Sequence, residues 1–261
     1  MGALNCAGCG VCCTSPIPPA FLRLIGIPVE GVDETRVQYF NDVLLFPHEI
    51  KALVERGYSD AIQLYGIDER FVIFRLFSPL TILDFTNFDP KDFPIEARKG
   101  DRWVGLSCIF QDVKTAKCVI HADPDRPEYC DIYPVRIESC PPHRIIGKYT
   151  PKKLNAIENW KKERDAGEYL VRMDTRNLDT STLTTKTMVK LLSKITGINA
   201  NKIKRLRNRA YEKDPIAKHM RERFREEQKL MELMKQRAKM NYWIEKYECD
   251  GIKRGWKWSG R

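Results

Sequence analysis

The sequence predicts an α+β fold in two parts, a small irregular module of short strands and helices followed by an α-helical, basic C-terminal region. Eight of the nine cysteines lie before residue 141, in two blocks of four. Short runs of β-branched and aromatic residues lie in the same part, whereas helical periodicity dominates from residue 150 onward. We therefore predict a cysteine-cluster domain at residues 1–149 and a helical region at residues 150–261.

The first part of the chain predicts one helix and several short strands. Pro47 suits a first helical turn and Gly57 a helix end, so FPHEIKALVERGY is predicted as a helix. Residues 123–143 contain five prolines and are predicted to be irregular. Runs of β-branched and aromatic residues predict strands at residues 71–77, 81–85, 103–110 and 117–121, with a helix left open at 81–85.

The second part predicts three helices. Proline opens the first at Pro151 and the third at Pro215, and glycine ends the first at Gly167 and the second at Gly197. The third helix is long and runs to about Cys249. Helical spacing places apolar residues on one face of each helix: Leu154, Ile157 and Trp160 in the first, Met188, Leu191, Leu192 and Ile195 in the second, and Ile216, Met220, Phe224, Met231, Met234 and Ala238 in the third.

The clustered cysteines are the strongest candidate site. In CAGCGVCC three cysteines are spaced by three residues and a fourth follows at once. Where thiols stay reduced, such clusters are more typical of metal binding than of disulfides. Cys249 stands apart and is expected to be a buried free thiol. The predicted metal ligands are Cys6, Cys9, Cys12, Cys13, Cys108, Cys118, Cys130 and Cys140.

Two kinds of metal centre fit this pattern. Zinc takes four ligands in a closed tetrahedron, and a C-x-x-C turn supplies two of them. A 4Fe–4S cluster takes three thiolates at C-x-x-C-x-x-C spacing and a fourth from a remote cysteine, often followed by proline as at Cys140–Pro141. The spacing favours the iron–sulfur cluster, and zinc remains open. A metal at this site would organise the irregular chain around it.

These cysteines resemble the signature of the CxxCxxCC family of zinc- or iron-chelating domains. The first block of the family is similar to CAGCGVCC of this chain, and the likeness extends to about residue 142. Three features depart from the usual pattern. His121 stands where a Tyr is usual, DPD lengthens the approach to Arg126–Pro127, and Asp131 replaces a usual Arg. The second block of the family is similar to Cys108–Ile109–Phe110, Cys118–Val119–Ile120, Arg126–Pro127–Glu128–Tyr129–Cys130 and Tyr133–Pro134.

The resemblance implies metal binding and leaves enzymatic activity open. One branch of the family, the flagellin lysine N-methylases, implies the alternative of an iron–sulfur-containing, S-adenosylmethionine-dependent protein lysine methylase. The sequence has no G-x-G-x-x-G nucleotide loop, because its glycines are scattered singly. No residue is assigned a catalytic role on this basis.

Positive charge is concentrated at the C-terminus. Residues 201–261 contain 19 Lys and Arg against 9 Asp and Glu, whereas residues 1–200 contain 26 of each sign. Unbalanced cations beside tryptophans suit phosphate neutralisation and base stacking, which predicts RNA or a ribonucleoprotein as partner. A solvated face on a helix that packs on its own domain, or on another protein, is the alternative. The predicted contact residues are Lys202, Lys204, Arg205, Arg207, Arg209, Lys253, Arg254, Trp256, Lys257 and Trp258.

The sequence also bears on location. No run of 18 or more apolar residues occurs, so no membrane partner is expected. The first residues lack the basic and apolar segments of a secretory signal. We therefore expect a cytoplasmic protein, in which thiols stay reduced.

Overall fold

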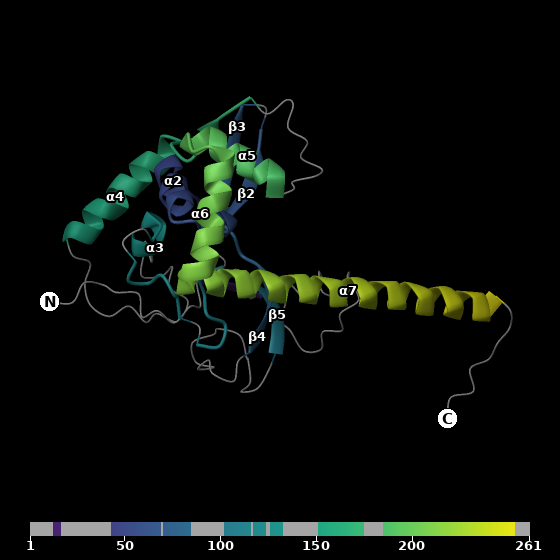
Figure 1. Ribbon diagram of the computed structural model, residues 1–261. Coiled ribbons are helices and arrows are strands. Elements are labelled where there is room, and N and C mark those ends of the chain that lie inside the picture. Colours follow the sequence, from purple (N-terminus) through teal and green to yellow (C-terminus); the bar gives the residue numbers. More distant parts are fainter. Residues whose placement is uncertain are drawn as a thin grey trace.

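Helices and short antiparallel strands build the molecule, in agreement with the predicted α+β class (Figure 1). The computed structural model describes residues 13–16, 43–68, 70–84, 102–115, 117–123, 126–132, 151–174 and 185–253, and within these it describes only the backbone of residues 14–16, 82–84, 102–105 and 237–253.

Two three-stranded antiparallel sheets form the β structure. The first has the order β1-β5-β4, with β1 at Thr14–Pro16, β4 at Leu80–Asp84 and β5 at Arg102–Ser107. The second has the order β2-β3-β6, with β2 at Ile62–Ile67, β3 at Phe71–Leu76 and β6 at Val171–Arg172.

Three of the four predicted strands are present, as β3, β4 and β5. The strand predicted at residues 117–121 is wrong. These residues form turns, with one isolated bridge between Gln111 and Cys118. A strand there would leave no turn after Cys118, whereas the His121 amide donates to the Cys118 carbonyl at 3.2 Å and closes one. Strands β1, β2 and β6 were not predicted.

Six helices and one short 3₁₀ turn are present in the described residues. The helices predicted from proline and glycine signals are confirmed, whereas α3 and α6 were not predicted. Their bounds are α2 Pro47–Glu55, η3 Ser59–Ala61, α3 Glu128–Ile132, α4 Pro151–Asp165, α5 Thr185–Thr196, α6 Ala200–Lys213 and α7 Pro215–Lys253.

Helix α2 starts and stops where its local sequence says. The Glu49 carboxylate accepts the Phe46 amide at 2.8 Å, which satisfies one free N–H of the first turn. The same carboxylate accepts the Glu128 amide at 2.7 Å and thereby ties α2 to α3. Gly57 follows the helix with a φ of 86°, in the left-handed region that glycine tolerates.

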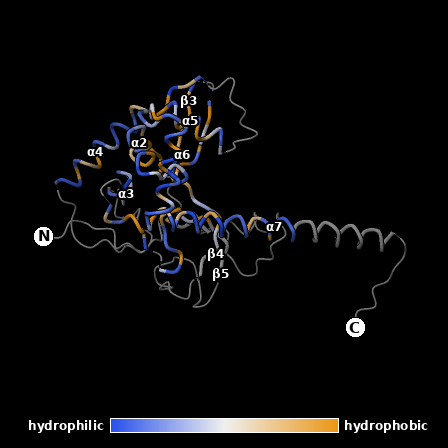
Figure 2. The backbone as a smooth tube through the Cα atoms, viewed as in Figure 1, coloured by the Kyte–Doolittle hydropathy of each residue, from blue (hydrophilic) through white to orange (hydrophobic). Residues whose placement is uncertain are grey.

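The main core lies between the β2-β3-β6 sheet and helices α2, α5 and α6, with the first turns of α7 added to it. Figure 2 shows hydrophobic residues concentrated in α2, α5 and β3. Residues before the predicted domain boundary, such as Ile50 and Phe74, share this core with later ones, such as Leu191 and Ile203. The boundary itself, between residues 149 and 150, lies outside the described residues.

A second, smaller cluster joins α3 to α4. It contains Phe46, Ile132, Ile157 and Trp160. Leu154, predicted on the same face of α4, is 46% exposed instead. Lys153 is buried in its place. Lys153, Ile157 and Trp160 are spaced by four and three residues and lie on one face of the helix, whereas two successive steps of three, as from Leu154, turn away from that face.

Helix α7 runs between the two sheets and then extends past the body of the molecule (Figure 1). Its first turns are buried, with Ala217 and Met220 fully covered, whereas Met231 and Leu233 are 42% and 61% exposed. Of the predicted apolar face, Met220 is therefore packed on the body and Met231 is exposed, whereas the side chain of Ala238 is not described. Within the described part of the chain, no helix combines the length and the apolar character that crossing a membrane requires.

Candidate metal centre

The end of the first cysteine block lies against the second block. Cys13 directly precedes β1 and Cys108 directly follows β5, and these two strands pair with Thr14 opposite Ser107. The Cys108 amide donates to the Cys13 carbonyl at 2.8 Å. Antiparallel pairing thus brings together two cysteines that are far apart in the sequence.

Two turns and a short helix bring the next cysteines to the same place. Cys108 and Cys118 each begin a turn, in which their carbonyls accept the Gln111 amide at 2.9 Å and the His121 amide at 3.2 Å. Cys130 lies in α3 and packs, like Cys108 and Cys118, against the main core. We refer to Cys13, Cys108, Cys118 and Cys130 as the thiol cluster.

No disulfide joins the four thiols, which are partly buried and close enough to act on one another electrostatically. Burial raises the pKa of Cys108, and the nearby Cys13 and Cys118 raise it further. Burial also raises the pKa of Cys130 well above its usual value, with Cys108, Cys13 and Cys118 acting in the same direction. Four thiolates could therefore coexist here only with a compensating positive charge.

The cluster is a gathering of donors and not a formed ligand cage. Among the residues that the structure describes, no three histidine, cysteine or carboxylate side chains are arranged to hold a metal ion. The donor set itself suits zinc and iron–sulfur clusters, because both are bound by cysteine thiolates. Partial exposure of the four cysteines also leaves a route of entry.

The other predicted ligands lie outside this picture. Cys6, Cys9, Cys12 and Cys140 fall outside the described residues. Cys249 lies near the C-terminal end of α7, where only the backbone is described, so its burial as a free thiol stays a prediction.

Arg126, beside the cluster in sequence, contacts two residues of the same segment, Asp131 and His121. Its Nε donates to Asp131 Oδ1 at 2.8 Å, and its Nη2 contacts the same oxygen. Its Nη1 lies 2.6 Å from His121 Nδ1. These contacts direct the Arg126 guanidinium toward Asp131 and His121.

A second arginine, Arg223 of α7, is the residue that sequence reasoning missed. It is 2% exposed, although arginine is mostly found on protein surfaces. Its Nη1 donates to Thr81 Oγ1 at 2.6 Å, and its Nη2 donates to the Ser107 carbonyl at 3.3 Å. Arg223 stands three residues after the buried Met220, and this spacing was the available signal.

The predicted nucleic-acid contacts divide into three groups. Lys202, Lys204, Arg205 and Arg209 are exposed on α6. Arg207 is half-buried and forms an ion pair with Asp60 at 3.4 Å. Lys253 ends α7, where only the backbone is described, and Arg254, Trp256, Lys257 and Trp258 lie outside the described residues.

The comparisons with known proteins returned no relative of this chain. No family model matches it, and no curated protein or solved structure is significantly similar to it.

Proposed function

We propose that this protein binds a metal centre, either a 4Fe–4S cluster or zinc, through the thiol cluster and the adjoining cysteines. The observation that carries this proposal is the convergence of four thiols from separate segments, namely the start of β1, the end of β5, the following turn and α3. The likeness to CxxCxxCC domains points the same way. Cys6, Cys9, Cys12 and Cys140 are proposed as further ligands.

Neutral thiols alone would give this arrangement little stability. A free cysteine packs as a small hydrophobic side chain, and alanine or valine would fill the same space without the reactivity. Ligation by a metal would also organise the turn at Cys118 and the short helix α3 that contains Cys130, where the described chain has little other regular structure. Metal affinity in such a module is at the same time folding free energy.

Binding requires the side chains to rearrange. Each ligating thiol must lose its proton and turn toward a common centre, because no described group of donors forms a cage. The Phe110 amide already donates a hydrogen bond to the Cys108 sulfur, and this contact favours the thiolate. Side-chain rotation alone moves a sulfur atom by a few ångströms, without any change in the backbone.

The proposal is tested by metal analysis of protein purified without oxygen. A brown protein whose broad absorbance is bleached by dithionite contains an iron–sulfur cluster, and a colourless protein with stoichiometric zinc contains a structural zinc site. Cys108→Ser and Cys130→Ser should lose the metal, whereas Cys249→Ser should keep it. A wild-type protein that holds no metal after incubation with Zn²⁺, or with iron and sulfide, would contradict the proposal.

We propose as well that the basic helices dock on RNA or on a ribonucleoprotein. Support comes from Lys202, Lys204, Arg205 and Arg209, which are exposed on α6 in a stretch, residues 200–209, without acidic residues. Cations in such an arrangement can neutralise neighbouring phosphates of a nucleic acid. The exposed Met231 and Leu233 of α7 offer a further surface to the assembly or to another protein.

A salt titration tests the docking. The variant with Lys202, Lys204 and Arg205 changed to Gln should bind single-stranded RNA more weakly, and the slope of log affinity against log salt should fall by about 2. The matched control changes Lys186, Lys190 and Lys194 to Gln, three exposed cations on α5. Equal losses in both variants would show that only overall charge matters.

A further inference from the structure

Arg223 is a buried cation at the edge of the thiol cluster. Two of its three guanidinium nitrogens donate to Thr81 of β4 and to the carbonyl of Ser107 of β5, the residue before Cys108. The third, Nε, has no partner although it is buried. The Ser107 contact places the guanidinium beside the backbone of Cys108, and Arg223 also acts electrostatically on that thiol.

Burying a guanidinium without a matching negative charge is costly. Glu226 is the nearest carboxylate, with its Oε2 3.9 Å from Arg223 Nη1, but its side chain is 57% exposed and solvent screens the pair. Glu227, which accepts the Leu80 amide at 3.0 Å, and Asp112 also attract Arg223, but burial still lowers the pKa of Arg223 below the usual arginine value. The described carboxylates therefore offset only part of the buried charge.

We infer that Arg223 balances the negative charge of the metal–thiolate centre, and this inference rests on the proposed function. Four thiolates around a divalent zinc ion, or around a 4Fe–4S core of the same charge, leave about two negative charges. A buried guanidinium beside Cys108 offsets one of them in a medium where charges interact strongly. Arg223 does not bind the metal itself but raises the affinity of the thiolates for it.

Replacing Arg223 should therefore have opposite effects on the metal-free and the metal-loaded protein. In the metal-free protein the thiols are neutral and the buried charge of Arg223 is only partly compensated, so its replacement by methionine should leave folding unharmed or improve it. In the metal-loaded protein the same change removes the counter-charge and should weaken metal binding. A purely structural role, through the Thr81 and Ser107 contacts, would instead lower the stability of both states.

The experiment uses the full chain with Zn²⁺ as the probe. Zinc affinity is measured by competition with a chelator, and the urea midpoint is measured with zinc and after its removal. Arg223→Met should lose about 10- to 100-fold in zinc affinity while the metal-free urea midpoint stays at or above that of the wild type. Arg223→Lys, which keeps the charge, should recover most of the affinity. Arg225→Gln, an exposed arginine of the same helix, is the matched control and should change neither quantity.

The outcomes separate the inference from the proposed function. If the wild type binds no zinc through its thiols, the proposed function fails, and the inference fails with it. If the wild type and Arg225→Gln bind zinc and Arg223→Met binds it equally well, the inference alone is wrong. Equal destabilisation of the loaded and metal-free forms by Arg223→Met would also overturn it, because the arginine would then act only through its hydrogen bonds.

Discussion

Replacing Gly57 by alanine tests how closely α2 and α6 approach each other. A Cβ at this position would lie 2.5 Å from the Leu206 carbonyl oxygen and 2.7 Å from Ala210 Cβ, so α6 would have to move. Its φ of 86° adds the cost of left-handed backbone, about 1–2 kcal/mol. Overpacking against another backbone adds about 1–3 kcal/mol. We expect Gly57→Ala to lower the free energy of unfolding by about 2–5 kcal/mol.

Gly197→Ala provides the control for this measurement. Gly197 has a similar φ of 70°, but a Cβ there would meet nothing within 4 Å. Its cost should be the backbone contribution alone, about 1–2 kcal/mol. Urea unfolding followed by circular dichroism gives both free energies in one series. If the two variants lose the same amount, the close approach of α2 and α6 carries no energetic weight and the packing argument is wrong.

Three further predictions follow from the described contacts. Ile203→Ala empties a fully buried position of α6 and should cost about 2–5 kcal/mol in urea unfolding, whereas Leu154→Ala, at an exposed position, should cost less than about 0.5 kcal/mol. Burial raises the pKa of Glu49, so the folded protein holds this proton more tightly than the unfolded chain and stability falls as pH rises above the ordinary Glu value. Glu49→Gln removes this loss, and its stability relative to the wild type should therefore increase between about pH 4 and pH 7 in urea titrations. Removing residues 237–261 should leave the free energy of unfolding within about 0.5 kcal/mol of the wild type in urea titrations, because the buried side chains described on α7 all precede residue 228.

Local sequence signals predicted most of the helices, but they missed α6. Helix α2 was predictable because Pro47 and Gly57 mark its two ends. Helix α6 was missed because its cations obscured two buried residues, Ile203 and Ala210. Its start was visible in retrospect, since the Asn199 side chain accepts the Asn201 amide at 2.9 Å as an N-cap. Charge-rich helices are thus read too easily as surface segments.

The candidate site was also predictable only in part. The approach of Cys13 to the second cysteine block followed from the idea that one metal needs ligands from both. The place of Arg223 could not follow from its residue type, because arginine is rarely buried. Only the packing of α7 onto β4 carries its side chain inward. The strand propensity of residues 117–121 was overridden for a related reason, since the turn at Cys118 buries Ile120 in the core.

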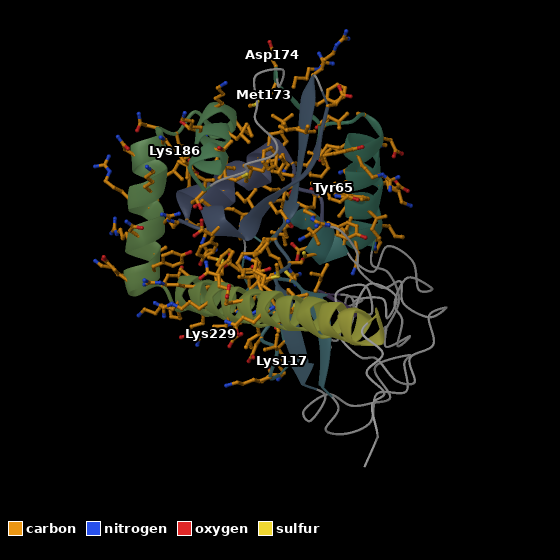
Figure 3. The ribbon with its side chains drawn as sticks, turned by 90° about the vertical axis from the view of Figure 1, so that its right-hand side faces the viewer. Tyr65, Lys117, Met173, Asp174, Lys186 and Lys229 are labelled. Carbon is orange, nitrogen blue, oxygen red and sulfur yellow. The ribbon has the colours of Figure 1, made fainter. Side chains whose placement is uncertain are left out.

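The geometry of α7 has a mechanical consequence. At 1.5 Å per residue the helix is about 58 Å long, and the 26 residues from 228 to 253 reach about 39 Å beyond its last buried turn. Figure 3 shows Lys229 and Lys117 on the side of α7 that faces away from α5 and α6, where the helix leaves the body. A rotation of about 10° at the anchored end would displace the far tip by about 7 Å, because a helix of this length acts as a rigid arm. Small movements of Arg223 beside the thiol cluster would thus become large displacements of the tip of α7. A pair of spectroscopic distance labels, one on α2 and one near Lys253, can measure them.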